Sequence, residues 1–432
     1  METIKFFTVG CKVNQYDTQS IREAFIQAGF KELEDSRAAD VYIINTCTVT
    51  HKADSDSLRL MHKARRENPK AKIIVTGCLA ELDADKIKKI DDASVIIKNK
   101  DKENILGYLS RHDETCKATE NTHRGISYFK GHTRAFLKIQ DGCNNFCSYC
   151  KVPLVRGRSR SKPIDEIIQE AKNLVKNDFR EIVLCGICLG AYGKDLFPPI
   201  SLVRVIAALE EIEGLMRIRL SSIEAGDVTD ELIDRMSQSL PDRQAGKKLC
   251  PHLHIPIQSG DDKILKRMNR KYCRDDYLNL IRKLKRQIPQ IAITTDVLVG
   301  FPAEDESNFQ NTLDLVKEIS PLKVHIFPYS KRGWTSAADN LKDEVKSDII
   351  KKRALRLKGL ADACALKYKK QFLNKNMPVL IECRSKDKPD SWEGYTDNYL
   401  KVLIKSNLEL KNQLIPLKLK EIDRDFVLAY FH

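Results

Sequence analysis

The sequence predicts an α/β protein in three parts: a doubly wound parallel sheet domain, a partial (β/α)6 barrel and a small C-terminal all-β barrel. Short apolar runs alternate with helical stretches in the first 120 residues, and this alternation resumes after residue 129 with no hairpin signals. After residue 367 the chain changes to short strands separated by polar turns. We therefore expect domains at residues 1–120, 129–366 and 367–432.

The composition favours a cytoplasmic protein with a polyanionic partner. The 432 residues are 42% hydrophobic, which is enough for two or three cores, and no run of 18 apolar residues or signal peptide is found. We therefore expect no membrane contact. The net charge of +14, from 74 basic and 60 acidic residues, makes nucleic acid a plausible partner. Thirteen cysteines, an odd number in this compartment, favour metal or cluster ligation over disulfides.

Three predicted strands in the first domain each run into a cysteine. The stretches "IKFFTVGC", "VYIINTC" and "IIVTGC" end at Cys11, Cys47 and Cys78. Helices are predicted after them over Gln15–Ala28, Ala53–Arg66 and Glu81–Ile90. Because the carboxyl ends of parallel strands meet at one edge of the sheet, the three thiols can converge on a shared ligand. The alternative is that they are ordinary buried cysteines.

A second cysteine group has a different spacing. The stretch "DGCNNFCSYC" carries Cys143, Cys147 and Cys150 as C-x3-C-x2-C. Structural zinc sites usually have four ligands, and no suitable fourth ligand is near, although a structural zinc motif remains the alternative. Three thiolates on a 4Fe-4S cluster leave one iron open to S-adenosylmethionine, whose reductive cleavage yields a 5′-deoxyadenosyl radical.

The barrel is predicted from six strands interleaved with amphipathic helices such as "PIDEIIQEAKNLVKN". The strands are expected at Ala135–Ile139, Glu181–Leu184, Arg217–Leu220, His252–Ile257, Ile293–Leu298 and Lys323–Phe327. The active site should lie at their carboxyl ends, beside the second cysteine group. Small or polar segments such as "CGICLGAYG", "SSIE", "IQSG" and "VGFP" follow these strands and allow close approach of a cofactor.

The other cysteines are expected to be structural. Cys185 and Cys188 have a C-x2-C spacing but no partner pair, so packing is the preferred interpretation. Unpaired structural or surface positions are expected for Cys116, Cys250, Cys273, Cys364 and Cys383.

Two basic segments could contact phosphate. "VRGRSRSK" contains Arg156, Arg158, Arg160 and Lys162, and the helical stretch Lys342–Lys370 contains ten Lys or Arg. A solvated surface is the alternative for both segments. The C-terminal all-β part has the size of an OB fold, a shape that often binds RNA.

The chain resembles the methylthiotransferase family of radical S-adenosylmethionine (SAM) enzymes along its whole length. That family has an N-terminal methylthiotransferase domain, a radical-SAM barrel and a C-terminal TRAM domain. The branch that acts on N6-threonylcarbamoyladenosine in tRNA is the most similar in five segments: "GCKVNQYDT", "INTCTVTHKAD", "HLHIPIQSG", "ILKRMNRKY" and "FPYSKR".

The resemblance implies two 4Fe-4S clusters and SAM. It assigns Cys11, Cys47 and Cys78 to an auxiliary cluster, and Cys143, Cys147 and Cys150 to the radical cluster. It places the backbone of Tyr149 against the adenine of SAM. Further cofactor contacts are implied at Gly186, Ser222, Glu224 and Gln258, and no catalytic side chain is implied beyond the cluster ligands.

The resemblance also implies the reaction and the partners. One SAM methylates a sulfur on the auxiliary cluster, and a second yields the radical that attacks C2 of an adenine just 3′ of the anticodon. The sheet edge and the barrel mouth must therefore face each other across the base. The partners are the tRNA anticodon loop, an external electron donor and a sulfur donor.

Some positions depart from the family pattern. Lys151 stands where Ile is common, Cys188 where Asn is common, and Ala225 where Pro is usual, and "KRGWTSAA" reorders the usual "KRPGT". Alternative functions are methylthiolation of isopentenyladenosine in tRNA, methylthiolation of a ribosomal protein side chain, and a non-catalytic zinc-stabilised RNA-binding protein.

Overall fold

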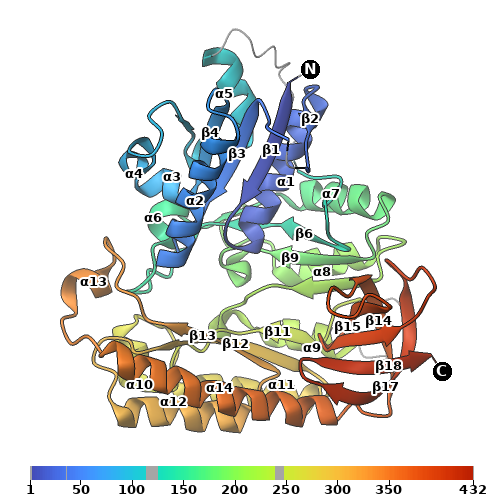
Figure 1. The fold of residues 1–432 in the computed structure, drawn as a ribbon. Helices are drawn as coiled ribbons and strands as arrows, with labels where there is room; N and C mark the ends of the chain where they lie inside the picture. The colour runs from blue at the N-terminus through green and yellow to red at the C-terminus, as the bar shows by residue number, and fades with distance from the viewer. Residues whose placement is uncertain (1, 36, 113–124, 239–247, 432) are drawn as a thin grey trace.

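A computed structural model describes residues 2–35, 37–112, 125–238 and 248–431. Cys116 lies outside these residues. Figure 1 shows the N-terminal sheet above an open half-barrel, with a small barrel at one side of the half-barrel. No helix in the described ranges combines the length and the apolar character that crossing a membrane requires.

The N-terminal sheet is parallel and five-stranded, with the order β2-β1-β3-β4-β5. Its strands are β1 (Thr3–Thr8), β2 (Lys31–Glu32), β3 (Val41–Thr46), β4 (Lys72–Gly77) and β5 (Val95–Ile96). The helices of this part are α1 (Lys12–Gln27), α2 (His51–Glu67), η1 (Asn99–Asn104) and α5 (Ile105–His112). Every residue of β3 is buried, as expected for a central strand of a doubly wound sheet.

The single helix predicted over Glu81–Ile90 is wrong. The structure has two short helices there, α3 (Cys78–Leu82) and α4 (Ala84–Lys88). Asp83 separates them in a non-helical conformation, with φ −145° and ψ 66°, and its side chain accepts a hydrogen bond from the Lys86 amide. An aspartate that caps a second helix in this way ends the first helix.

The middle of the chain forms the predicted half-barrel of six parallel strands. They are β6 (Arg134–Lys138), β9 (Glu181–Cys185), β10 (Arg217–Leu220), β11 (His252–His254), β12 (Ala292–Val299) and β13 (Lys323–Pro328). β6, β9 and β10 form one sheet and β11, β12 and β13 another, and the isolated bridges Ile218–Leu249 and Ser222–His254 join the two. β11 ends earlier than predicted, because Pro256 cannot donate to a strand ladder.

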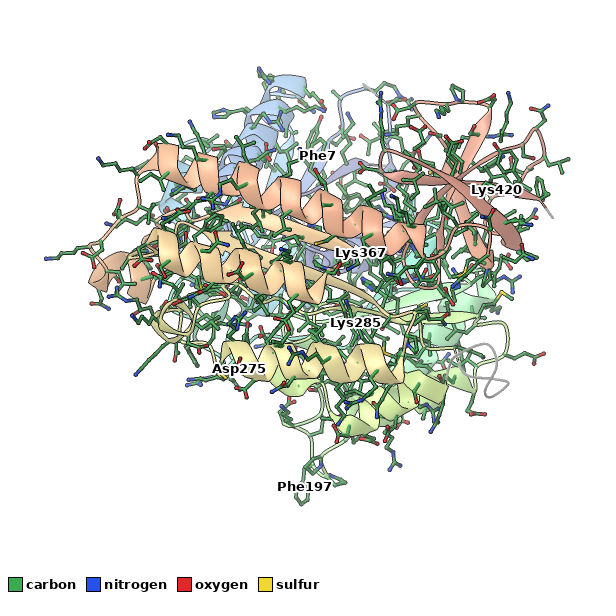
Figure 2. The ribbon with its side chains drawn as sticks, turned by 90° about the horizontal axis from the view of Figure 1, so that it is seen from below. Phe7, Phe197, Asp275, Lys285, Lys367 and Lys420 are labelled. Carbon is green, nitrogen blue, oxygen red and sulfur yellow. The ribbon has the colours of Figure 1, made fainter. Side chains whose placement is uncertain are left out.

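Helices cover the outer face of the half-barrel. The main ones are α7 (Ile164–Lys176), α8 (Leu202–Glu210), α9 (Asp230–Gln238), α11 (Arg274–Gln287), α12 (Glu306–Ile319) and α14 (Ser347–Lys370). Shorter elements are β7 (Gln140–Asp141), α6 (Val152–Arg156), β8 (Arg160–Ser161), η2 (Leu189–Ala191), η3 (Ala225–Asp227), α10 (Asp262–Arg267) and α13 (Ser336–Asn340). Figure 2 shows α11, α12 and α14 side by side, with Lys285 and Lys367 labelled on this outer layer.

The basic helix α14 buries one side and exposes the other. Ile350 and Leu357 are buried in the barrel core, whereas Lys351, Lys352 and Lys358 are exposed on the outer surface. Figure 1 shows α14 below the strands of the half-barrel, with the N-terminal sheet above them, and contact between this helix and phosphate stays a prediction.

The C-terminal strands close into a barrel with the order β14-β15-β16-β18-β17. They are β14 (Asn376–Arg384), β15 (Ser391–Thr396), β16 (Lys401–Lys405), β17 (Leu414–Asp423) and β18 (Phe426–Phe431). The domain boundary expected at residue 366 lies inside α14, which continues to Lys370.

Candidate active site

The first three cysteines lie together at one edge of the N-terminal sheet. Cys47 and Cys78 directly follow the adjacent strands β3 and β4, and Cys11 caps α1 just beyond β1. Burial raises the pKa of the Cys47 thiol to about 12, and the neighbouring Cys78 and Cys11 thiols add to this rise. The three thiols are therefore close enough to interact electrostatically, as the predicted shared ligand requires.

Two glycines let the backbone approach this edge closely. Gly10 has φ +111°, and a Cβ on it would lie 2.9 Å from Cβ and 3.0 Å from Sγ of Cys47. Gly77 has φ +97°, and a Cβ there would lie 2.3 Å from the carbonyl oxygen of Thr46. A larger residue at either position would displace the segment that carries Cys47.

Side-chain amides hold the three strand ends in place. Asn14 donates through Nδ2 to the carbonyl oxygens of Val9, at 2.7 Å, and Thr46, at 2.9 Å. Asn45 donates to the carbonyl of Asn14 at 2.9 Å, and the hydroxyl of Thr46 donates to the carbonyl of Thr76 at 2.6 Å. These bonds connect the ends of β1, β3 and β4.

A buried charge network lies beneath this cysteine group. Asp17 pairs with Lys102 at 2.9 Å, Lys138 at 2.6 Å and Arg156 at 3.1 Å, and Arg156 also pairs with Asp141 at 3.0 Å. Lys138 also lies 3.8 Å from the exposed Glu103, so three carboxylates face three cations. Burial raises the pKa of Cys78, but the nearby Arg156 and Lys102 charges lower it. The Arg156 and Lys102 charges therefore favour a thiolate, or another anionic group, at this edge.

The second cysteine group lies on the loop after β7. Gly142 begins this loop at φ +76°, and a Cβ on it would lie 2.0 Å from the carbonyl oxygen of Arg158. The Cys143 and Cys147 charges both act on the pKa of Cys150, which burial raises to about 12. The three thiols are therefore close together, as the spacing predicts.

Arg270 connects the second cysteine group to a predicted cofactor residue. It donates to Sγ of Cys147 at 3.4 Å and forms a short ion pair with Glu224. Burial raises the pKa of the Glu224 carboxyl, whereas Arg270 lowers it. This arginine belongs to the segment "MNRKY" but was not among the predicted site residues.

The packing interpretation is incomplete for Cys188. Cys185 is buried at the end of β9 as expected, but the interaction with Cys188 lowers the pKa of the Cys143 thiol to about 7, and the Cys188 thiol donates to Oδ2 of Asp227 at 3.9 Å. Asn145 in turn donates to Sγ of Cys188 at 3.7 Å. Cys188 therefore lies in direct contact with the second cysteine group.

The residues predicted to contact SAM lie at consecutive strand ends beside this loop. Gly186 follows β9, Ser222 follows β10, and Gln258 follows β11. The backbone N–H of Gln258 donates to the backbone carbonyl of Asp296 at 2.8 Å. A Cβ on Gly186 would lie 2.8 Å from Oε1 of Gln140, so the strand end needs glycine there. The ring of Tyr149 lies edge-on to Phe301 with centroids 6.4 Å apart, and the structure does not test the role predicted for its backbone.

The two cysteine groups lie near each other. Cys150 precedes α6 in the chain, and Arg156, the last residue of α6, interacts with Cys78. The five residues of α6 rise only about 7.5 Å. A second link joins the N-terminal sheet to the half-barrel, because the Lys12 and Cys11 charges act on the pKa of Cys185 at the end of β9. Figure 1 shows β1 and β3 directed towards the half-barrel, which is the arrangement that a shared substrate base requires.

Neither cysteine group is arranged around a single ion. Within the described residues, the only three His, Cys, Asp or Glu side chains whose ligand atoms all lie within 4.8 Å are His254, Asp296 and His325. A tetrahedral zinc holds its sulfur ligands about 3.8 Å apart. The three Sγ atoms of each cysteine group do not all lie within 4.8 Å of one another.

Two departures from the family pattern lie against each other. Nζ of Lys151 is 5.6 Å from the ring centroid of Trp334, which belongs to the reordered "KRGW" segment. The neighbouring Arg332 is buried and donates to the carbonyl of Thr48, at 2.8 Å, and to Asp54, at 2.7 Å. This loop therefore joins the half-barrel to the residue after Cys47.

Known proteins resemble both halves of this site. Residues 3–98 match the group described as "Uncharacterized protein family UPF0004", and residues 137–316 match the Radical SAM superfamily. The threonylcarbamoyladenosine tRNA methylthiotransferase MtaB of Bacillus subtilis is 38% identical, over 97% of this chain and 94% of its own length. The chain belongs to the methylthiotransferase family.

Other relatives carry two different names. MtaB of Thermotoga maritima is 37% identical, over 88% of this chain and 87% of its own. The tRNA-2-methylthio-N(6)-dimethylallyladenosine synthase of Clostridium tetani is 35% identical, over 95% and 92%. The radical SAM methyltransferase TsrM of Kitasatospora setae shares the fold, with a TM-score of 0.56 at 13% identity over 78% of this chain and 75% of that one. This methylthiotransferase is thus a radical SAM enzyme, a class that carries a 4Fe-4S cluster and uses SAM.

Proposed function

We propose that this methylthiotransferase converts N6-threonylcarbamoyladenosine next to the tRNA anticodon into its 2-methylthio derivative. The identity of 36–38% to several enzymes of that name over most of the chain carries the proposal. The geometry supports it, because Arg156, six residues after Cys150, interacts with Cys78, and Cys11 interacts with Cys185 at the end of β9. Membership of an enzyme family excludes the alternative of a non-catalytic zinc-stabilised RNA-binding protein.

The residues fit the two cofactors that the proposal needs. Each cysteine group offers three thiols to a 4Fe-4S cluster, which leaves one iron free of protein. Nε of Arg156 is buried with no hydrogen-bond partner in the described residues, so a donor is available beside Cys78. Gly186 is only half-buried at the end of β9, where SAM would bind.

The chemistry that the bound cofactors supply is methyl transfer to sulfur and homolytic removal of the C2 hydrogen of adenine, with electrons and sulfur from external donors. The protein holds and orients the reactants. Asn14 and Asn45 keep the edge of the N-terminal sheet rigid, and Arg270 places Glu224 beside the radical group. The anticodon-loop base must leave its stack to reach this interior.

Replacing Arg156 with glutamine should weaken the auxiliary cluster. The variant loses the cation beside Cys78 and leaves Asp17 and Asp141 with two lysines. We expect the affinity for this cluster to fall about 10- to 100-fold, as is typical when a residue supporting a ligand is lost. Iron content and the electron paramagnetic resonance spectrum of the reduced protein measure the change. Arg158→Gln, two residues further and outside this charge network, is the matched control.

Nucleoside mass spectrometry tests the function directly. We expect 2-methylthio-N6-threonylcarbamoyladenosine to disappear from tRNA when the gene is deleted and to return with the wild-type gene. Loss of the 2-methylthio derivative of isopentenyladenosine instead would assign the other tRNA substrate. An unchanged set of tRNA nucleosides would refute the proposal and favour the ribosomal protein substrate.

A further inference from the structure

Three polar side chains that belong to neither cysteine group meet inside the half-barrel. His254 on β11, Asp296 on β12 and His325 on β13 have ligand atoms within 4.8 Å of one another. All three are half-buried, so they border open space, whereas the alternate residues of β13, Val324 and Ile326, pack on the core under the outer helices. Neither the family comparison nor the cluster assignment gives these side chains a role.

The hydrogen bonds of His254 are fully used. Its Nε2 lies 3.1 Å from Oδ1 of Asp296 and its Nδ1 lies 2.9 Å from the hydroxyl of Thr294. A carboxylate only accepts, so Nε2 of His254 donates to Asp296. The Thr294 hydroxyl also lies 3.1 Å from Nε2 of His252. These contacts fix the ring of His254 and the position of Asp296.

The partners left for a ligand are His325 and the second oxygen of Asp296. Within the described residues, His325 touches the ring of His254, at 5.6 Å between centroids, but makes no hydrogen bond. Burial lowers the pKa of His325, and the Lys323, His254 and Lys12 charges lower it further against the opposing effect of Asp296. His325 is therefore a neutral ring at pH 7 that can donate one hydrogen bond and accept another.

The surrounding charge favours an anionic ligand. Lys12 follows Cys11 and acts on His252, His325 and Tyr399 across the interior. Two histidines and a carboxylate would also suit a divalent cation. However, both nitrogens of His254 are already occupied, and the field of Lys12 and Lys323 opposes a cation at this place.

The position fits a substituent of the target base. The Asp296 carbonyl accepts from the amide of Gln258, a predicted SAM contact, and the Asp296 charge acts on Glu224 beside the radical group. Lys12 stands beside Cys11 of the auxiliary group. A base held between the two cysteine groups would direct its N6 substituent to this cluster.

We propose that His325, Asp296 and Lys12 bind the carboxylate-bearing substituent on N6 of the target adenosine and thereby select it over an apolar one. The inference rests on the proposed function. Lys12 and the ring N–H of His325 would pair with the carboxylate, and Asp296 would accept from an N–H or O–H of the same substituent. An apolar dimethylallyl group would leave all three without partners in a half-buried site, which is how a polar pocket rejects such an analogue.

The test compares two RNA substrates with His325 variants. Anticodon stem–loops carrying N6-threonylcarbamoyladenosine or N6-dimethylallyladenosine are the probes, and kcat and KM are measured separately. His325→Phe keeps the ring but removes its hydrogen bonds, and we expect KM for the threonylcarbamoyl RNA to rise about 10- to 100-fold. We expect kcat to change little, and His325→Asn, which retains a donor, to recover part of the loss. His62→Phe, on the exposed side of α2, is the control.

Each outcome decides one question. If the wild-type enzyme leaves the threonylcarbamoyl RNA unmodified, the proposed function fails. If the wild-type enzyme modifies it and His325→Phe shows the same KM and the same preference between the two RNAs, only the selectivity inference fails. A stoichiometric non-iron metal that is present in the wild type and lost in His325→Phe would identify a cation site and overturn the inference. Reductive SAM cleavage at the wild-type rate shows that the variant is folded.

Discussion

Replacing Cys47 with alanine is expected to abolish methylthiolation while leaving reductive cleavage of SAM nearly unchanged. Cys47 lies at the end of β3 beside Cys11 and Cys78, whereas SAM cleavage depends on the other cysteine group. Loss of a residue that only supports a ligand already costs about 10- to 100-fold in metal affinity, so loss of a ligand should reduce product formation by at least about 100-fold. Product nucleoside and 5′-deoxyadenosine are measured in the same anaerobic reaction.

Cys383→Ala is the matched control, because this exposed cysteine on β14 belongs to neither group. It should retain both activities. Iron analysis adds an independent measurement: Cys47→Ala should lose about four irons per chain, the content of one cluster. If Cys47→Ala still forms methylthiolated product, or if SAM cleavage falls together with it, the separation into two centres is wrong.

The fold and the cysteine edges could be predicted because both depend on local sequence. An apolar run that is too short for a helix specifies a buried strand, and a cysteine at its end is carried to the sheet edge by the parallel topology. Cys47 and Cys78 directly follow β3 and β4 for this reason. The break at Asp83 could have been predicted as well, because an aspartate three residues before Lys86 is a helix-capping signal.

The supporting residues could not be found in this way, because their roles depend on partners that are distant in the sequence. Arg156 belongs to a basic stretch that predicts a solvated or phosphate-binding surface, yet it is only 4% exposed. Its partner Asp17 lies 139 residues away. In the same way, His254 and His325 approach Asp296 only through the register of three strands. Local patterns contain no information about such pairs.

Replacing Glu181 with glutamine is expected to destabilise the contact between the half-barrel and the C-terminal barrel by about 3–5 kcal/mol, the usual cost of removing one partner from a buried ion pair. Glu181 is fully buried on β9 and pairs with Arg219 at 2.7 Å, with Arg217 and Arg134 at 3.7 and 3.8 Å. Arg217 and Arg219 also donate to backbone carbonyls of the C-terminal barrel. Without Glu181 these arginines keep their charge but lose their common carboxylate.

The pH dependence gives this prediction a second measurement. Burial would raise the pKa of Glu181, but the arginines hold it at about 2, below the value of about 4.3 for an unfolded glutamate. A carboxyl whose pKa is depressed in the folded state stabilises the fold at any pH above its unfolded pKa. That stability is lost as the pH falls from about 4.3 towards 2. The wild type should therefore lose more stability over this range than Glu181→Gln does.

Hydrogen exchange of β10 and β15 and denaturant unfolding measure the effect. The control is Glu344→Gln, whose partner Lys331 is as exposed as Glu344 itself, so removing that ion pair should cost at most about 1 kcal/mol. The decisive comparison is between the two variants at neutral pH. Equal protection of β10 in Glu181→Gln and Glu344→Gln would show that the arginines on β10 need no buried carboxylate to hold the C-terminal barrel.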